Sequence, residues 1–152
     1  MTLAEPKTLY FEDLSLGMRE TYSKLVTSAD IVAFAEVSGD RNPIHLSDEY
    51  AAKTPFGSRI AHGIYTASLI SAVIGTRLPG PGAIYISQTL RFLAPVRIDD
   101  TVVASVEIVD LSERGRRAKL RCTCNVGDTL VMEGEAEVKV PPRPITTPAP
   151  NP

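Results

Sequence analysis

The amino-acid sequence predicts an α+β domain in which an antiparallel sheet wraps a long buried helix. Residues 61–76 are the most apolar helix candidate, with apolar side chains nearly all round, a pattern typical of a buried helix. Four segments after residue 83 then alternate apolar and polar side chains, as strands with one buried face do. A helix followed by such a run of strands favours a sheet that carries its helices on one face.

The first part of the chain is predicted to be a short strand followed by two helices. Residues 21–26 have the composition of a strand, and Thr27 or Ser28 is placed to cap a helix that ends at Gly39. Residues 48–52 are expected to form a second short helix, because a serine precedes them and acidic residues fill the first turn.

The strands are expected over residues 84–92, 102–108, 118–126 and 130–140. Turn signals at 113–116 and at Gly127-Asp128 predict antiparallel neighbours. The residues expected on the buried face of the first strand are Ile84, Ile86, Leu90 and Phe92.

Composition limits the classes of function. At 152 residues the chain is expected to hold one domain over residues 1–140, with a flexible proline-rich tail over 141–152. A net charge of −2 gives no reason to expect nucleic acid or a membrane surface as a partner, and neither a membrane span nor a secretory signal is expected.

Cys122 and Cys124 are predicted to be buried and reduced, in a cytoplasmic protein. No metal site is expected, because two thiols without clustered histidines do not hold zinc.

The residues with the clearest chemical meaning lie between Ser38 and His45. Asp40 and His45 are five residues apart, and Asn42 and Pro43 stand between them. A carboxylate and an imidazole on one stiff turn are suited to moving a proton at neutral pH. The pair is therefore the candidate catalytic site.

Three motifs together resemble those of the MaoC-like hotdog-fold dehydratases, and most closely those of the short (R)-specific enoyl-CoA hydratases. They are Gly-Asp-x-Asn-Pro-x-His at 39–45, Ala-His-Gly at 61–63 and Phe-Leu-Ala-Pro-Val at 92–96. The similarity covers roughly residues 8–140. It implies a hotdog fold, a homodimer joined edge to edge, and a substrate carried as a thioester of coenzyme A or acyl carrier protein.

The resemblance also implies roles for individual residues. Asp40 and His45 correspond to the catalytic pair, and Gly63 to the residue whose backbone N–H stabilises the thioester oxygen. Ser71 corresponds to a supporting serine, and Asn42 is expected to shape the turn. The implied reaction is reversible syn addition of water to a trans-2-enoyl thioester, giving the (R)-3-hydroxyacyl product without a cofactor. Candidate residues for the acyl pocket are Ile64, Leu69 and Ile74.

Each of these residues also has a purely structural interpretation. In many proteins, an aspartate and an asparagine placed like Asp40 and Asn42 only shape an Asx-type turn. In that interpretation His45 is a structural histidine. His62 is expected to be structural, at the start of the buried helix. A serine such as Ser71 often bonds only the carbonyl one turn back.

Two other functions remain open from the sequence. A hotdog thioesterase uses the same substrate handle, but directs water at the carbonyl carbon. A non-catalytic module that binds acyl thioesters is expected to lack either Asp40 or His45, and both are present.

Overall fold

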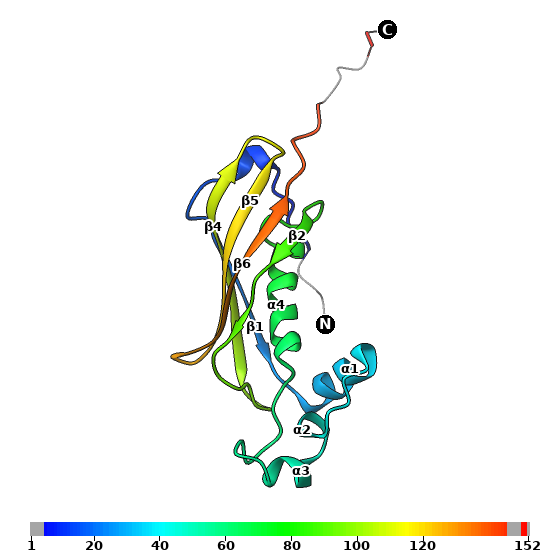
Figure 1. Ribbon diagram of the computed structural model, residues 1–152. Coiled ribbons are helices and arrows are strands. Elements are labelled where there is room, and N and C mark those ends of the chain that lie inside the picture. Colours follow the sequence, from blue (N-terminus) through cyan, green and yellow to red (C-terminus); the bar gives the residue numbers. More distant parts are fainter. Residues whose placement is uncertain (1–4, 146–149, 152) are drawn as a thin grey trace.

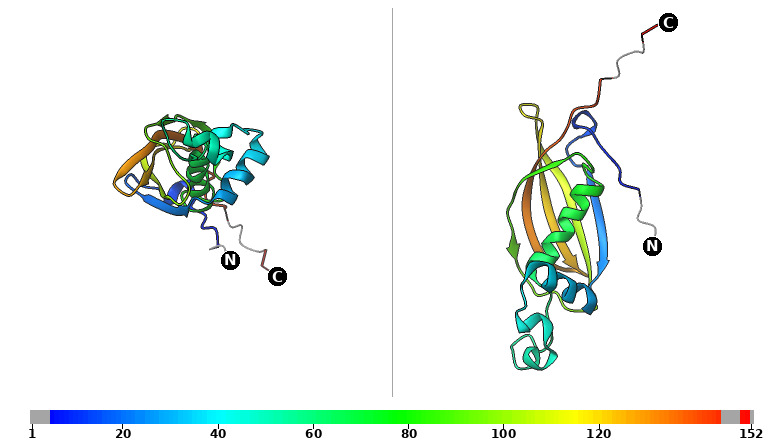
Figure 2. Two further views of the ribbon diagram at one scale, coloured as in Figure 1. Left: turned by 90° about the horizontal axis from the view of Figure 1, so that it is seen from below. Right: turned by 90° about the vertical axis from the view of Figure 1, so that its right-hand side faces the viewer.

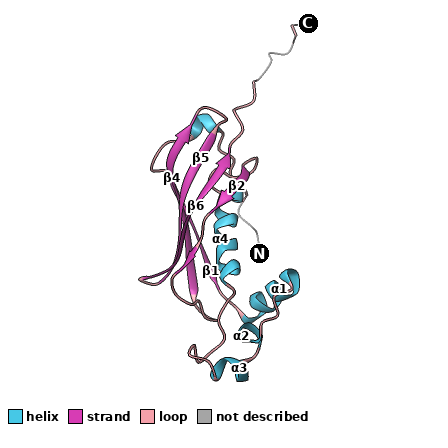
Figure 3. Ribbon diagram, viewed as in Figure 1, coloured by secondary structure: helices cyan, strands magenta, loops and turns pink. Residues whose placement is uncertain are grey.

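The computed structural model describes residues 5–145, 150 and 151, and its centre is a single curved antiparallel sheet (Figures 1 and 3). The strands lie in the order β1-β4-β5-β6-β2, and β3 pairs with β6 beside β2. Their bounds are β1 Arg19–Leu25, β2 Ile84–Gln88, β3 Arg91–Phe92, β4 Thr101–Ser112, β5 Arg117–Val126 and β6 Thr129–Lys139.

Helix α4 (Gly63–Thr76) lies along the concave side of the sheet, which curves around it (Figure 2). Its buried residues face alternate residues of the long strands, so that β4 contributes Val102, Ala104, Val106 and Ile108 to the core. The predicted antiparallel sheet around a central helix is confirmed. The alternation in β4, β5 and β6 predicted this arrangement correctly because each of these strands has one face against the core.

Three short helices, α1 (Ser28–Ser38), α2 (Pro43–Leu46) and α3 (Asp48–Ala52), lie together beyond the N-terminal end of α4 (Figure 1). Thr27 caps α1 in a capping box with Asp30, and Gly39 ends it with a φ of 80°. Both boundaries agree with the prediction. The predicted buried helix begins at Gly63 rather than at residue 61, because His62 has extended dihedral angles and is the N-cap.

The strand predicted over residues 84–92 differs from the structure. It is divided into β2 and β3, and the pairing of β2 with β6 shifts in register between Tyr85 and Ser87. Its expected inward residues Ile84, Ile86 and Phe92 are 58%, 43% and 52% exposed. The physical reason is position: this segment forms the edge of the sheet, where no other element among the described residues covers it.

Helix α4 is also less enclosed than its composition predicts. Ile64 is 57% exposed, and Ser68 and Ser71 lie on the same exposed face. The sheet covers only one side of the helix, so the small and apolar residues on the opposite side remain in contact with solvent in this chain.

The first residues of the predicted C-terminal tail, which begins at residue 141, contact the N-terminal segment. The backbone N–H of Phe11 donates to the carbonyl of Pro141, and Arg143 pairs with Asp13 of a short 3-10 helix (Phe11–Asp13). The backbone N–H of Arg143 also donates to the carboxylate of Glu12. Residues 141–143 are therefore held against the N-terminal segment. Residues 146–149 and 152 lie outside the described part of the chain.

The structure also bears on membrane-spanning helices and on the two cysteines. Within the described residues, no helix is long and apolar enough to cross a membrane. Cys122 and Cys124 are free and fully buried in β5, as the alternation predicted.

Candidate active site

The segment from Gly39 to His45 is a series of short turns that fix Asp40 beside the end of α1. The backbone N–H of Asn42 donates to Oδ1 of Asp40 at 3.2 Å, and the backbone N–H of Ile44 donates to Oδ1 of Asn42 at 3.1 Å. Asn42 is the N-cap of α2 and Pro43 its first residue, a position that proline favours. The Asx turn is therefore present, and it places Asp40 rather than competing with a chemical role.

His45 lies in α2 with a side chain that is only 8% exposed. Its Nδ1 is 2.7 Å from the carbonyl oxygen of Ile60. A carbonyl oxygen only accepts, so Nδ1 carries the hydrogen and Nε2 of the neutral ring keeps a free lone pair. The backbone is held as well, because Nε of Arg59 donates to the carbonyl of His45 at 2.6 Å. The ring is thus oriented as a proton acceptor.

The pKa of His45 is lowered from its ordinary value of 6.5, mainly because burial disfavours the charged ring. The hydrogen bond to Ile60 and the charge of Asp40 oppose this effect, and the neighbouring His62 adds to it. His45 is therefore neutral at pH 7, the form that can accept a proton.

His62 brings these groups together. A carboxylate oxygen of Asp40 and one ring nitrogen from each of His45 and His62 lie within 4.8 Å of one another. These are residue types that also bind metals, but the two rings are stacked, and one nitrogen of each bonds a backbone carbonyl. We interpret the cluster as an acid–base site. The prediction that His62 stands at a helix start is confirmed, and its contact with the pair could not be read from the sequence.

Gly63 is the first residue of α4, where a backbone N–H has no acceptor within the helix. The positive end of the helix dipole adds to the attraction for a negatively charged oxygen at this point. A Cβ built on Gly63 would lie 2.8 Å from Cε1 of Phe92, so glycine allows this ring to approach the backbone. The position suits a donor to a developing oxyanion.

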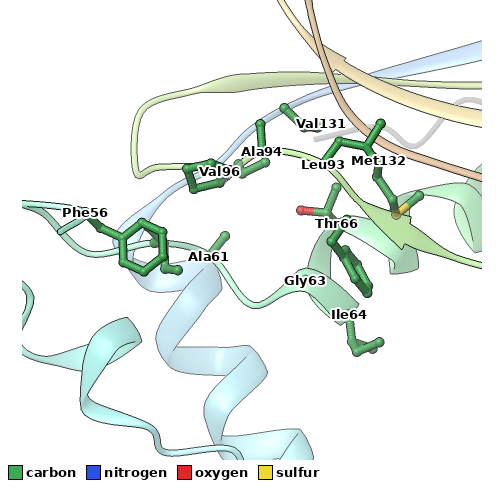
Figure 4. A pocket seen from close by; sticks show the side chains of 13 residues that line it. Phe56, Ala61, Gly63, Ile64, Thr66, Leu93, Ala94, Val96, Val131 and Met132 are labelled. Carbon is green, nitrogen blue, oxygen red and sulfur yellow. The ribbon is translucent and has the colours of Figure 1, made fainter. Parts of the chain in front are cut away.

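A pocket of about 520 Å³ opens beside Gly63, between the start of α4 and the segment that connects β3 to β4 (Figure 4). Its lining is apolar apart from the side chain of Thr66, whose hydroxyl lies one turn after Gly63. Asp40 and His45 do not line it. His45 adjoins it through Ile60, which both lines the pocket and accepts the hydrogen bond from His45. The lining residues are Phe56, Ile60, Ala61, Gly63, Ile64, Thr66, Phe92, Leu93, Ala94, Pro95, Val96, Val131 and Met132.

The structure brings only some of the predicted pocket residues to this place. Ile64 lines the pocket, whereas Leu69 and Ile74 are packed in the core on the side of α4 that faces the sheet. Ser71 is on the exposed side of α4 in this chain and outside the pocket, and its supporting role stays a prediction. Thr66 was missed, although a lone polar residue on an apolar helix face, three positions after Gly63, could have indicated it.

Comparison with known proteins identifies the class. A family model for the MaoC like domain matches residues 16–137, most of the chain. The chain is similar to the R-hydratase PhaJ1 from Pseudomonas aeruginosa in its unliganded form, with a TM-score of 0.88 and 37% identity over 97% of this chain and 98% of that one. The chain therefore belongs to the MaoC-like family, and the fold is that of its hotdog R-hydratases.

Two relatives show which enzymes of the family this chain resembles. A 3-hydroxybutyryl-CoA dehydratase from Methylorubrum extorquens is 64% identical over 91% of this chain and 88% of its own length. An (R)-specific enoyl-CoA hydratase from Rhodospirillum rubrum is 50% identical over 88% of this chain and 93% of its own length. The resemblance to the short (R)-specific enoyl-CoA hydratases is confirmed.

Proposed function

We propose that this protein is an (R)-specific enoyl-CoA hydratase, a hydro-lyase that interconverts trans-2-enoyl and (R)-3-hydroxyacyl thioesters. The observation that carries the proposal is the neutral imidazole of His45, oriented by Ile60 and placed beside the carboxylate of Asp40. Gly63 supplies a helix N-terminal N–H next to an apolar pocket. The names of the relatives point to the same reaction.

In this mechanism, Nε2 of His45 takes a proton from a water molecule that also donates a hydrogen bond to Asp40. The water oxygen bonds to C3, and the electrons of the double bond move through C2 to the thioester oxygen. The N–H of Gly63 stabilises the resulting enolate. The enolate then collapses and C2 takes a proton from His45, which restores the neutral ring. Dehydration is the reverse sequence.

The experiment follows crotonyl-CoA by two readouts, the loss of conjugated-enoyl absorbance and the release of free thiol. Loss of absorbance without thiol release is the expected result for a hydratase, and chiral chromatography should identify an (R)-3-hydroxy product. Thiol release instead would indicate a thioesterase, and binding without either change would indicate a binding module. Running the same chain length on acyl carrier protein tests the choice of coenzyme A as the handle.

Variants connect this assay to the site. Asp40→Asn and His45→Gln should each lower the rate of hydration at least about 100-fold, because proton transfer by a positioned side chain typically contributes that much. Asp48→Asn is the matched control for Asp40, since Asp48 is an acid at the start of α3 outside the cluster. Wild-type rates in a folded Asp40→Asn or His45→Gln protein would contradict the proposed roles.

We also propose that a second copy of the chain covers the edge formed by β2 and β3. This edge exposes Ile84, Tyr85, Ile86, Phe92 and Leu93, each between 41% and 58%. An uncovered strand edge with apolar side chains promotes association, and natural proteins normally protect such edges. A homodimer joined at this edge, as the family resemblance implies, would cover them.

Light scattering coupled to size-exclusion chromatography tests the dimer. The wild-type chain should elute with twice the mass of one chain, and Ile86→Lys should shift it toward the monomer. Val109→Lys is the matched control, because Val109 is exposed to nearly the same extent, 41% against 43%, on β4 away from this edge. A wild-type monomer, or a dimer that Ile86→Lys leaves intact, would contradict the proposal.

We further propose a cytoplasmic location. Two free thiols, Cys122 and Cys124, are buried side by side on one face of β5, which fits a reducing compartment. Recovery of the native protein with the cytosol after cell fractionation is expected, and recovery from the extracellular medium would contradict this location.

A further inference from the structure

His62 contacts both members of the proposed catalytic pair. Its Nε2 is 2.9 Å from the backbone carbonyl oxygen of Asp40, so Nε2 carries the hydrogen and donates it. Its ring stacks on that of His45, with 3.8 Å between the centroids and 28° between the planes. Phe34 packs against His62 as well, at 4.8 Å between ring centroids. The side chain of His62 thus contacts both Asp40 and His45, which the turn at residues 40–45 also joins locally.

The place of His62 is itself fixed. The side chain is only 2% exposed, and the residue is the N-cap of α4, directly before Gly63. Its neighbour Ala61 donates its backbone N–H to the carbonyl of Val96 at 2.7 Å. The ring therefore projects from a rigid point between the sheet and the start of α4.

We propose that His62 is a positioning residue, whose ring holds Asp40 and His45 in a fixed relation to each other and to Gly63. This inference rests on the proposed hydratase function. In this role, the histidine of the Ala-His-Gly motif acts through Asp40 and His45 and not directly on the substrate.

The turn that carries Asp40 needs such an anchor. Asp40 is exposed, and its other hydrogen bonds, to Ser38 and Asn42, join residues only two positions apart in sequence. The bond from His62 spans 22 residues and ties this turn to α4. A displacement of about 1 Å in a catalytic group can lower a rate about 100-fold, so an anchor of this kind has a direct effect on turnover.

The ring of His62 also influences the charge of the His45 ring on which it stacks. The titratable and charged groups around His45 are Asp40, His62 and the guanidinium of Arg59. After burial and the opposing hydrogen bond to Ile60, the next influence on the pKa of His45 is His62, which lowers it. Replacing His62 by an uncharged residue should therefore raise the pKa of His45.

Two variants divide the contacts of His62. His62→Phe keeps a ring to stack on His45 but loses the bond to Asp40; no partner of Nδ1 is lost, because that atom bonds none of the described residues. His62→Gln keeps an N–H donor near the position of Nε2 but loses the ring. Tyr65→Phe is the matched control: it removes one hydrogen bond of a buried aromatic residue, the 3.4 Å bond to Asp30, away from the pair.

Steady-state kinetics with crotonyl-CoA form the first readout. We expect His62→Phe to lower kcat about 10- to 100-fold with KM changed less than about threefold, because substrate contacts are intact and only the reacting groups have moved. His62→Gln should recover part of this loss, and Tyr65→Phe should leave kcat within about twofold. Equal losses in kcat for the Phe and Gln variants, or wild-type kcat in both, would overturn the proposal.

The second readout does not depend on turnover. The chain has two histidines, so in either His62 variant an NMR titration reports on His45 alone. Its pKa should rise in both variants and stay unchanged in Tyr65→Phe. If the wild-type protein proves inactive on enoyl thioesters, the proposed function fails while this titration still tests the contact. An unchanged pKa of His45 in both variants would overturn the positioning role.

Discussion

Replacing Gly63 by alanine separates the packing role of this residue from its chemical role. The added Cβ would lie 2.8 Å from Cε1, 3.0 Å from Cδ1 and 3.2 Å from Cζ of Phe92, all closer than ordinary contact. These atoms belong to a ring that is 52% exposed and can turn away. Giving up the remaining burial of a phenylalanine costs about 1 kcal/mol, and alanine in place of glycine in a helix returns about 0.5–1 kcal/mol.

The free energy of unfolding should therefore change by less than about 1 kcal/mol. Activity should respond differently, because the new methyl group occupies the space beside the N–H that the thioester oxygen needs. Removing one oxyanion donor typically costs about 100- to 1,000-fold in rate, equivalent to about 2.7–4 kcal/mol. We expect a loss of this size in kcat/KM for crotonyl-CoA.

Urea denaturation and the enoyl-absorbance assay on the same preparation measure both effects. Gly75→Ala is the matched control, since Gly75 lies in the same helix and a Cβ there meets nothing within 4 Å. It should stabilise the protein slightly and leave activity unchanged. The reasoning is refuted if a folded Gly63→Ala protein keeps wild-type kcat/KM, or if its activity is lost only together with several kcal/mol of stability.

Three other predictions concern the fold and its titration. In Gly134→Ala the Cβ would lie 1.9 Å from the backbone carbonyl oxygen of Thr89. Because neither backbone can move freely, the free energy of unfolding measured in urea should fall by about 3 kcal/mol. A loss below about 0.5 kcal/mol would contradict the packing described. Because burial lowers the pKa of His45 below 6.5, the unfolded chain binds the proton more tightly, so stability should decrease as the pH falls below that value. Urea titrations on either side of it should show this decrease, and His45→Gln should reduce it; an identical pH dependence in the variant would contradict the assignment. Burial raises the pKa of Cys122 to about 11 and that of Cys124 to about 12. Both thiols should therefore resist alkylation in the folded protein and react in urea, as measured by mass spectrometry. Rapid labelling of either thiol before unfolding would show that the strand opens.

Local sequence signals predicted the parts of the structure that depend on local interactions. Thr27 and Gly39 mark the ends of α1 because capping bonds and a positive φ involve only neighbouring residues. The alternation in β4 and β5 predicted their buried faces because each strand is covered on one side by the same core. The turn at Asp40 was predicted for the same reason.

The remaining features depend on contacts between distant segments. Composition shows that α4 is apolar, but only the position of the sheet decides that Leu69 faces the core and Ser71 faces solvent. The stacking of His62 on His45 joins residues that are 17 positions apart on different elements. Similarly, an alternating pattern does not reveal that Ile84 belongs to an edge strand, where its side chain is 58% exposed.

The position of Phe92 gives the edge of the sheet a thermodynamic link to the site. Phe92 belongs to β3, at the exposed edge, and the same ring lies against Gly63 and lines the pocket. Anything that binds at the edge and fixes this ring alters the free energy of binding in the pocket, and the effect must be reciprocal and equal in size. Substrate affinity should therefore depend on protein concentration in the range where the edge changes from free to occupied, even though Asp40 and His45 lie elsewhere, in and beside α2.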